Sequence, residues 1–146
     1  MSGMITVGAV HCLITTLPKC VNIKASKQEI LETMLNGSPF TRAVYVTSDD
    51  GVLEGIITLQ DVLEGLVISL GYNPHEKVKT SQKLFKYSPF GTAGDIMKSP
   101  VFVKTNTPLE DALKIMVLQR LNELPVVDEQ NKLIGDLNAF EMLKYI

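Results

Sequence analysis

Hydrophobic and polar positions alternate in the same way in the two halves of this chain. In the second half, apolar residues recur three and four positions apart over residues 109–117, which predicts an amphipathic helix. Short apolar runs at residues 101–103, 124–127 and 133–135 predict strands, with polar turn residues before the last of them. A final helix is expected from about Asn138. The predicted order is therefore strand, helix, strand, strand, helix.

The first half predicts the same order of elements. Apolar runs indicate strands at residues 20–23, 43–46 and 53–57. Apolar positions at helical spacing follow the first strand at residues 30–35 and the third strand at residues 59–67. The connections in the two halves match in length to within about a residue, so the chain contains an internal repeat.

Both repeats begin their first helix on a recognisable capping pattern. Ser26 is followed three residues later by Glu29, and Thr107 is followed by Glu110, which is the spacing of a capping box. Pro108 suits the first helical position, where its missing N–H is not needed. We expect both helices to start at these residues.

The repeat sets the expected domain organisation. We predict a first repeat at residues 10–70, a linker at residues 71–91 and a second repeat at residues 92–146. A single unit with one small sheet buries a low fraction of its surface. We therefore expect an α/β (α+β) fold in which two pseudo-symmetric β-α-β-β-α repeats pack sheet to sheet.

Composition and charge are ordinary for a folded soluble protein. Hydrophobic residues make up 45% of the 146 residues and the formal net charge is −2, which argues against binding to nucleic acid or to a membrane surface. The mean hydropathy of +0.16 is high for a small soluble protein, and the last helix is apolar on more than one side. A homodimer is the expected partner of that helix. We see neither a signal peptide nor a run of about 20 apolar residues, and expect a cytoplasmic protein.

Catalytic chemistry is not indicated. The two cysteines, Cys12 and Cys20, form no C-x-x-C pair, and His11 and His75 are too few for a familiar metal cluster. The chain shows no nucleophile–base pair and no phosphate loop of the Walker type. We therefore predict no catalytic residues, no metal site and no required cofactor.

Short motifs in both repeats resemble those of the CBS domain pair, or Bateman module. The segment from Gly55 to Asp61 reads glycine, two hydrophobic residues, threonine, two more residues and aspartate. The second copy carries Asp95-Ile96-Met97, Leu124-Pro125-Val126-Val127-Asp128 and Gly135 in matching order. The resemblance covers roughly residues 10–146. It implies a regulatory module whose clefts between the repeats bind adenosine-containing ligands such as AMP, ADP, ATP or S-adenosylmethionine.

The resemblance suggests binding roles for residues of the first copy. It implies that Asp61 accepts hydrogen bonds from the ribose hydroxyls, that Thr58 contacts ribose or phosphate, and that Arg42 meets phosphate. Spacing alone would make Asp61 and Thr58 helix caps, and a solvated surface arginine is an equal alternative for Arg42. Val44 is expected in the base slot or the core, and Tyr45 in the core.

The leading segment of the second copy is expected to complete the same site. The resemblance makes Thr92 a base-contacting residue, and the small Ala93 and Gly94 would permit close approach to a ring. The second copy itself departs from the pattern, with Asn138, Glu141 and Glu123 assigned to the positions of Thr58, Asp61 and Arg42. We therefore expect one competent nucleotide site per chain.

Three functions remain open from the sequence. The favoured one is a regulatory sensor of an adenine nucleotide that signals to an unknown protein target. The alternatives are an interaction module with vestigial clefts and, least favoured, an enzyme. The lysine-rich linker is expected to be a solvated segment. Its alternatives are a basic flap near the phosphate and, against the overall acidity of the chain, a nucleic-acid contact. Its lysines are Lys77, Lys79, Lys83 and Lys86.

Overall fold

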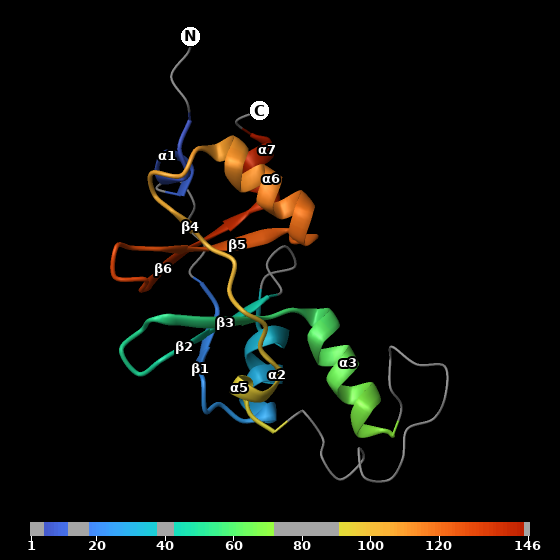
Figure 1. The fold of residues 1–146 in the computed structure, drawn as a ribbon. Helices are drawn as coiled ribbons and strands as arrows, with labels where there is room; N and C mark the ends of the chain where they lie inside the picture. Colours follow the sequence, from blue (N-terminus) through green and yellow to red (C-terminus); the bar gives the residue numbers. More distant parts are fainter. Residues whose placement is uncertain (1–4, 12–17, 38–42, 72–90, 145–146) are drawn as a thin grey trace.

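Each repeat forms its own three-stranded sheet with the same topology (Figure 1). The computed structural model describes residues 5–11, 18–37, 43–71 and 91–144. In both sheets the central strand is parallel to the first strand and antiparallel to the third. The strands of the first sheet are β1 (Cys20–Asn22), β2 (Val44–Thr47) and β3 (Leu53–Ile57), and those of the second are β4 (Val103–Lys104), β5 (Glu123–Val127) and β6 (Leu133–Asn138).

Helices cover the outer faces of the two sheets, so the predicted α/β fold of two β-α-β-β-α repeats is confirmed. The described helices are α1 (Val7–His11), α2 (Lys27–Leu35), α3 (Leu59–Ser69), α5 (Ala93–Ile96), α6 (Leu109–Gln119) and α7 (Ala139–Leu143). The predicted strands lie within three residues of the observed ones, because the pattern of hydrophobic positions is a local property of the chain.

One of the two predicted helix caps is wrong. The Ser26 hydroxyl accepts the Glu29 N–H at 3.2 Å, as expected for the start of α2. The Thr107 hydroxyl instead accepts the N–H of Lys104 at 3.0 Å, and α6 begins after Pro108 without a side-chain cap. The Thr107 side chain is thus used by the turn that leaves β4, and the predicted capping box with Glu110 does not form.

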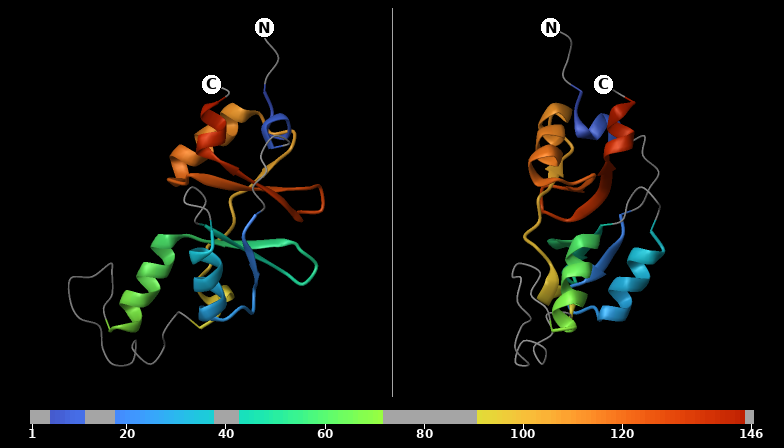
Figure 2. Two further views of the ribbon diagram at one scale, coloured as in Figure 1. Left: turned by 180° about the vertical axis from the view of Figure 1, so that it is seen from behind. Right: turned by 90° about the vertical axis from the view of Figure 1, so that its right-hand side faces the viewer.

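The two sheets face each other across an apolar layer, as the sequence predicted (Figure 2). Side chains alternate along β2: Val44 and Val46 point toward the helices, while Ala43 and Tyr45 point toward the second repeat. The two hairpin turns also pair through their backbones. Leu53 N–H donates to the Asn131 carbonyl at 2.9 Å and Leu133 N–H donates to Gly51 at 3.1 Å.

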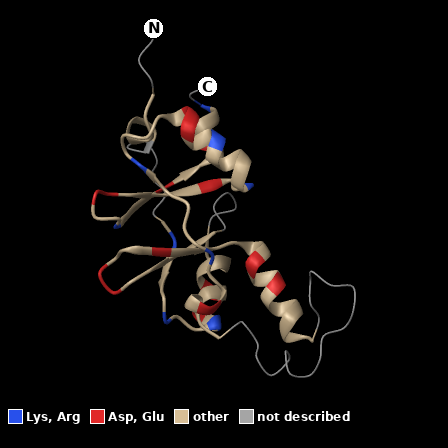
Figure 3. Ribbon diagram, in the orientation of Figure 1, with Lys and Arg blue, Asp and Glu red and all other residues tan. Residues whose placement is uncertain are grey.

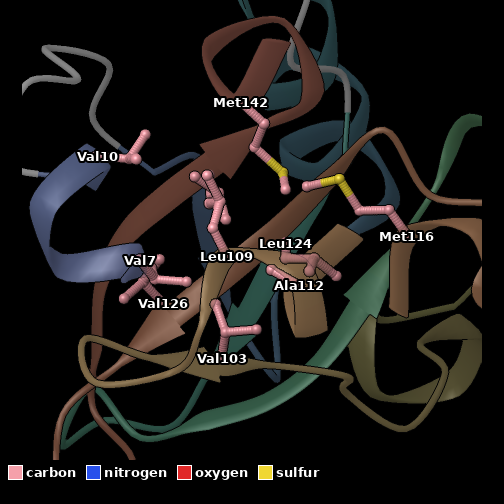
Figure 4. Packing of buried hydrophobic residues seen from close by; sticks show 10 residues of the cluster. Val7, Val10, Val103, Leu109, Ala112, Met116, Leu124, Val126 and Met142 are labelled. Carbon is pink, nitrogen blue, oxygen red and sulfur yellow. The ribbon is translucent and has the colours of Figure 1, made fainter. Parts of the chain in front are cut away.

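The short helix that leads into each repeat packs on the core of the other repeat. Val7 and Val10 of α1 are fully buried in the core of the second repeat, among residues of α6, β5 and α7 (Figure 4). Ala93 of α5 is fully buried in the core of the first repeat. Gly8 comes so close to Thr105 that a Cβ would lie 2.8 Å from its carbonyl oxygen. The two repeats therefore complete each other's cores.

Candidate functional site

Asp61 lies in the first turn of α3 and forms a capping box with Thr58. Its Oδ2 accepts the Thr58 N–H at 2.8 Å and the Thr58 hydroxyl at 2.9 Å, while the same hydroxyl accepts the Asp61 N–H at 3.2 Å. Thr58 has the extended backbone of a residue that joins a strand to a helix. The capping interpretation of these two residues is thus correct, and it occupies one of the two carboxylate oxygens.

The second carboxylate oxygen of Asp61 meets a lysine from the far side of the linker. Lys98 Nζ lies 2.8 Å from Asp61 Oδ1. The hydrogen bond to this carboxylate raises the pKa of the Lys98 ammonium; desolvation opposes the rise, and the charges of Asp61 and Glu64 add to it. The arrangement brings an anionic acceptor and a cationic donor together at the N-terminus of α3.

The main chain holds Lys98 at this place. Its N–H donates to the Ile56 carbonyl at 2.9 Å, and the Ile56 N–H donates to the Lys98 carbonyl at 3.1 Å. Gly55 allows this approach, because a Cβ there would lie 2.5 Å from the Met97 sulfur. Lys98 was not predicted from the sequence. The available signal was its place directly after Asp95-Ile96-Met97, in the leading segment that is expected to complete the Asp61 site.

Two residues predicted to contact the base, Val44 and Ala93, are buried in the core of the first repeat. The Val44 side chain points to the helices and is fully buried in the first core. Ala93 is also fully buried there, and its N–H donates to the Ala25 carbonyl at 3.0 Å. Packing within the first repeat accounts for both residues and agrees with the core alternative for Val44, while contact of either residue with a base stays a prediction. Packing also explains why residue 94 is a glycine, since a Cβ there would lie 3.2 Å from a side-chain carbon of Ile23.

Thr92 precedes α5 and donates to Asp95 as Thr58 donates to Asp61, but its side chain makes no capping hydrogen bond to the helix backbone. Its N–H and hydroxyl donate to Asp95 Oδ2 at 2.8 and 3.1 Å. Contact of Thr92 with a base stays a prediction. Several other predicted features lie outside the described residues; these are Arg42, His75 and the linker lysines Lys77, Lys79, Lys83 and Lys86.

The second copy has a different arrangement at the matching helix. Asn138 accepts the Glu141 N–H at 2.9 Å and so takes the capping position of Thr58. Glu141 Oε2 lies 3.4 Å from Lys144 Nζ on its own helix. The first copy's carboxylate therefore meets a cation from the other repeat's leading segment, whereas Glu141 meets the C-cap lysine of its own helix, α7.

The predicted match between Arg42 and Glu123 is wrong by one position. Val44 pairs with Ile57 and Leu124 pairs with Leu137, so Glu123 corresponds to Ala43. A one-residue shift moves a strand side chain to the opposite face. Glu123 accordingly lies between the sheets, where its Oε1 accepts the Ala43 N–H at 2.5 Å.

A buried tyrosine and two acids join the sheets at this level. Tyr45 is fully buried, as predicted, and its hydroxyl donates to Asp136 Oδ1, with Glu123 beside it. Burial, followed by the charges of Asp136 and Glu123, raises the pKa of the Tyr45 hydroxyl well above its ordinary value. This role of Asp136 was not predicted from the sequence, although a charged residue within an apolar strand pattern was a visible signal.

The described residues offer no group of histidine, cysteine, aspartate and glutamate side chains that suits a metal ion. Within the same parts of the chain, no helix has the length and apolar character needed to cross a membrane. The candidate site consists of the capped carboxylate of Asp61 and of Lys98, which comes from the other repeat's leading segment.

Two repeats that exchange their leading helices and face each other through their sheets define a tandem α/β module. The family model for the CBS domain matches residues 7–68 and 93–146, so the chain belongs to the CBS domain family. The match covers both repeats, which confirms the resemblance noted in the sequence.

Solved structures show the same architecture over nearly the whole chain. A CBS domain-containing protein from Thermotoga maritima is 34% identical with a TM-score of 0.78, covering 97% of this chain and 94% of that one. The structure of CBSX2 in complex with AMP is 26% identical with a TM-score of 0.71, covering 96% of this chain and 94% of that one. CBSX2 is a protein of Arabidopsis thaliana.

Curated relatives are longer proteins. An L-aspartate semialdehyde sulfurtransferase of Methanocaldococcus jannaschii is 26% identical over 129 residues, which cover 85% of this chain and 23% of that protein. The chain spans less than half the length of the curated relatives that it matches first.

Proposed function

We propose that this chain is a regulatory module that binds an adenosine-containing nucleotide at the Asp61 site and signals the binding to a protein target. The observation that carries the proposal is the meeting of Asp61 and Lys98 at the N-terminus of α3. A carboxylate suits the two ribose hydroxyls, and an ammonium suits a phosphate. The AMP complex of the similar CBSX2 supports the ligand class.

Binding supplies a means of regulation in this architecture. A ligand between segments of both repeats shifts their relative arrangement when it binds one arrangement more tightly than another. Lys98 follows α5, and Asp61 belongs to α3, so a ligand that contacts both would couple the second repeat's leading segment to the first repeat. We propose this coupling as the signal, and binding in place of catalysis as the function.

One ligand per chain is the proposed stoichiometry. The carboxylate of Asp61 is 3% exposed and meets Lys98, whereas Glu141 lies beside Lys144 on its own helix. Among the described residues, Glu141 of the second copy therefore does not pair with a cation from the other repeat. Loss of a charged hydrogen bond to ribose in Asp61→Ala should weaken binding about ten- to a hundredfold.

Isothermal titration calorimetry with AMP, ADP, ATP and S-adenosylmethionine tests the proposal. The expected result is binding of at least one of the adenine nucleotides at one site per chain, weakened in Asp61→Ala and unchanged in Glu141→Ala. Circular dichroism checks that the variants are folded, because Asp61 also caps α3. The absence of binding by all four compounds would overturn the function, and unchanged binding by Asp61→Ala would overturn the site.

A second candidate is a protein-interaction module with vestigial nucleotide sites. Both Asp61 oxygens already have protein partners, and apolar side chains on α6 and α7 face outward. Val117 is 71% exposed, Leu118 79% and Leu143 63%. Co-purification of a defined protein partner by ligand-free chain, together with no nucleotide binding, would favour this candidate.

We also propose that the chain acts as a cytoplasmic homodimer. Exposed apolar side chains on α3 and on α7 support a second copy as the partner, with Leu63 47% and Leu143 63% exposed.

A further inference from the structure

Both oxygens of the Asp61 carboxylate contact protein groups. Oδ2 accepts two hydrogen bonds from Thr58, and Oδ1 meets the Lys98 ammonium. The Asp61 side chain is 3% exposed while that of Lys98 is 62% exposed. The lysine therefore lies on the solvent side of the ion pair, and a ligand reaching Asp61 meets Lys98 as well.

The backbone of Lys98 is fixed by hydrogen bonds, whereas the ammonium at the end of its side chain can move. The two backbone hydrogen bonds with Ile56 fix the position of its Cα. Beyond the Cα, a lysine side chain has four carbons with rotatable bonds and three N–H donors on the ammonium. The ammonium can thus leave or share Asp61 Oδ1 without a change in the main chain.

Two acidic side chains of the described residues act on this ammonium. Figure 3 shows acidic positions in the first half of α3, which are Asp61 and Glu64. Both charges act on Lys98 and raise its pKa. A phosphate brought near Asp61 and Glu64 without Lys98 would be repelled by two like charges.

We propose that Lys98 makes the Asp61 site selective for phosphorylated nucleosides. The inference rests on the proposed function, because it concerns the ligand of the same site. A phosphate gives the ammonium a second anionic partner, so Asp61 Oδ1 becomes available to the ribose hydroxyls. An uncharged nucleoside competes with the ion pair and offers no charge in exchange. A ligand with a cationic sulfonium adds a like charge to the lysine.

The internal symmetry marks Lys98 as a feature of one site only. Thr6 bridges to Pro108 as Thr92 bridges to Ser26, so Thr6 and Thr92 hold matching positions. Six residues after Thr92 stands Lys98, and six residues after Thr6 the sequence has Cys12. A cysteine carries no positive charge, so the sequence provides the charge-selecting residue for the Asp61 site alone.

The test compares AMP with adenosine in titrations of the wild-type chain, Lys98→Met and Lys98→Arg. The wild type should bind AMP at least about tenfold more tightly than adenosine, the size expected for one charge-assisted contact. Lys98→Met should reduce that ratio about tenfold, by weakening AMP and strengthening adenosine. Lys98→Arg, which keeps the charge, should retain most of the preference.

Lys114→Met is the matched control. Lys114 is a solvent-exposed lysine whose Nζ lies 3.9 Å from Glu110 on α6, so its replacement makes the same change in net charge on the other repeat. It should leave the AMP-to-adenosine ratio unchanged. Thermal unfolding of each variant confirms that the compared chains are folded.

The outcomes separate this inference from the proposed function. Binding of AMP by the wild type with the same AMP-to-adenosine ratio in Lys98→Met overturns the role of Lys98 and leaves the nucleotide site standing. Binding of neither compound by the wild type overturns the proposed AMP selectivity, and the proposed function falls with it only if ADP, ATP and S-adenosylmethionine also fail to bind.

Discussion

Among the single residues, a buried hydrogen bond connects the two repeats. Tyr45 belongs to β2 of the first sheet, and its hydroxyl donates to Asp136 of β6 in the second. Tyr45 is fully buried and Asp136 is 2% exposed. A buried carboxylate that loses such a donor keeps its desolvation cost, so removal of the donor is more costly than the mean value of a hydrogen bond.

Tyr45→Phe should therefore destabilise the fold by about 2 kcal/mol, since it removes the hydroxyl and little volume. Urea unfolding of the variant and of the wild type gives the difference in unfolding free energy. Glu110→Gln on the exposed face of α6 is a suitable control and should change stability by less than about 0.5 kcal/mol. Equal stability of Tyr45→Phe and wild type would show that the contact contributes nothing.

The same hydroxyl predicts a dependence of stability on pH. The pKa of Tyr45 is raised in the folded chain, so the unfolded chain releases this proton first as the pH rises through about 10. The contribution of Tyr45 to the free energy of unfolding is therefore fully present below that pH, and it decreases as the pH rises above it. Unfolding between about pH 9 and pH 11 should show a steeper loss for the wild type than for Tyr45→Phe. Parallel losses would contradict the assignment.

At the scale of elements, the exchange of leading helices is the main organising feature. Each of α1 and α5 is too short to be stable by itself, and each is ordered by the core of the other repeat. A strand or helix can be read from local spacing, but the repeat on which it packs cannot. The predicted first repeat begins at residue 10, whereas Val7 and Val10 serve the core of the second.

Val7→Ala should destabilise the chain by about 2 kcal/mol through a cavity in the second repeat. Hydrogen exchange locates the effect: amides of β6 should exchange faster, while those of α2 should change less. Val117→Ala, at a position 71% exposed on α6, should be nearly neutral. A loss of protection confined to the first repeat would argue against the exchange of α1.

Gly8→Ala tests the same packing from the backbone side. The added Cβ would lie 2.8 Å from the Thr105 carbonyl oxygen, which is main chain and yields little. At Gly94 the nearest atom is an Ile23 side-chain carbon at 3.2 Å. Gly8→Ala should therefore lower the unfolding temperature more than Gly94→Ala. The reverse order in differential scanning calorimetry would refute this account.

At the scale of the whole molecule, two similar repeats create an approximate symmetry that the side chains break. The sheets have the same topology and their turns pair with each other. The helix starts differ, because Asp61 meets Lys98 across the repeats while Glu141 meets Lys144, the C-cap of its own helix, α7. The proposed single nucleotide site and its charge selectivity follow from that difference.

The proposed homodimer is tested at this scale by mass. Light scattering after gel filtration should give about twice the chain mass of 16.1 kDa for the wild type. Leu143→Glu places a charge on the exposed apolar side of α7 and should shift the mass toward that of the monomer. Leu35→Glu, at a 75% exposed position of α2, is the control and should not. A monomeric wild type would overturn the proposal.

The sequence by itself determined the repeated β-α-β-β-α order, the elements to within a few residues, and the CBS resemblance. Each of these depends on the spacing of neighbouring residues, as at Ser26 and over the strand that holds Tyr45. Tertiary structure alone decided that Val44 faces the helices, that α1 serves the second core, and that Lys98 closes Asp61. These features join residues far apart in the chain, where strand register and competing contacts decide which side chains meet.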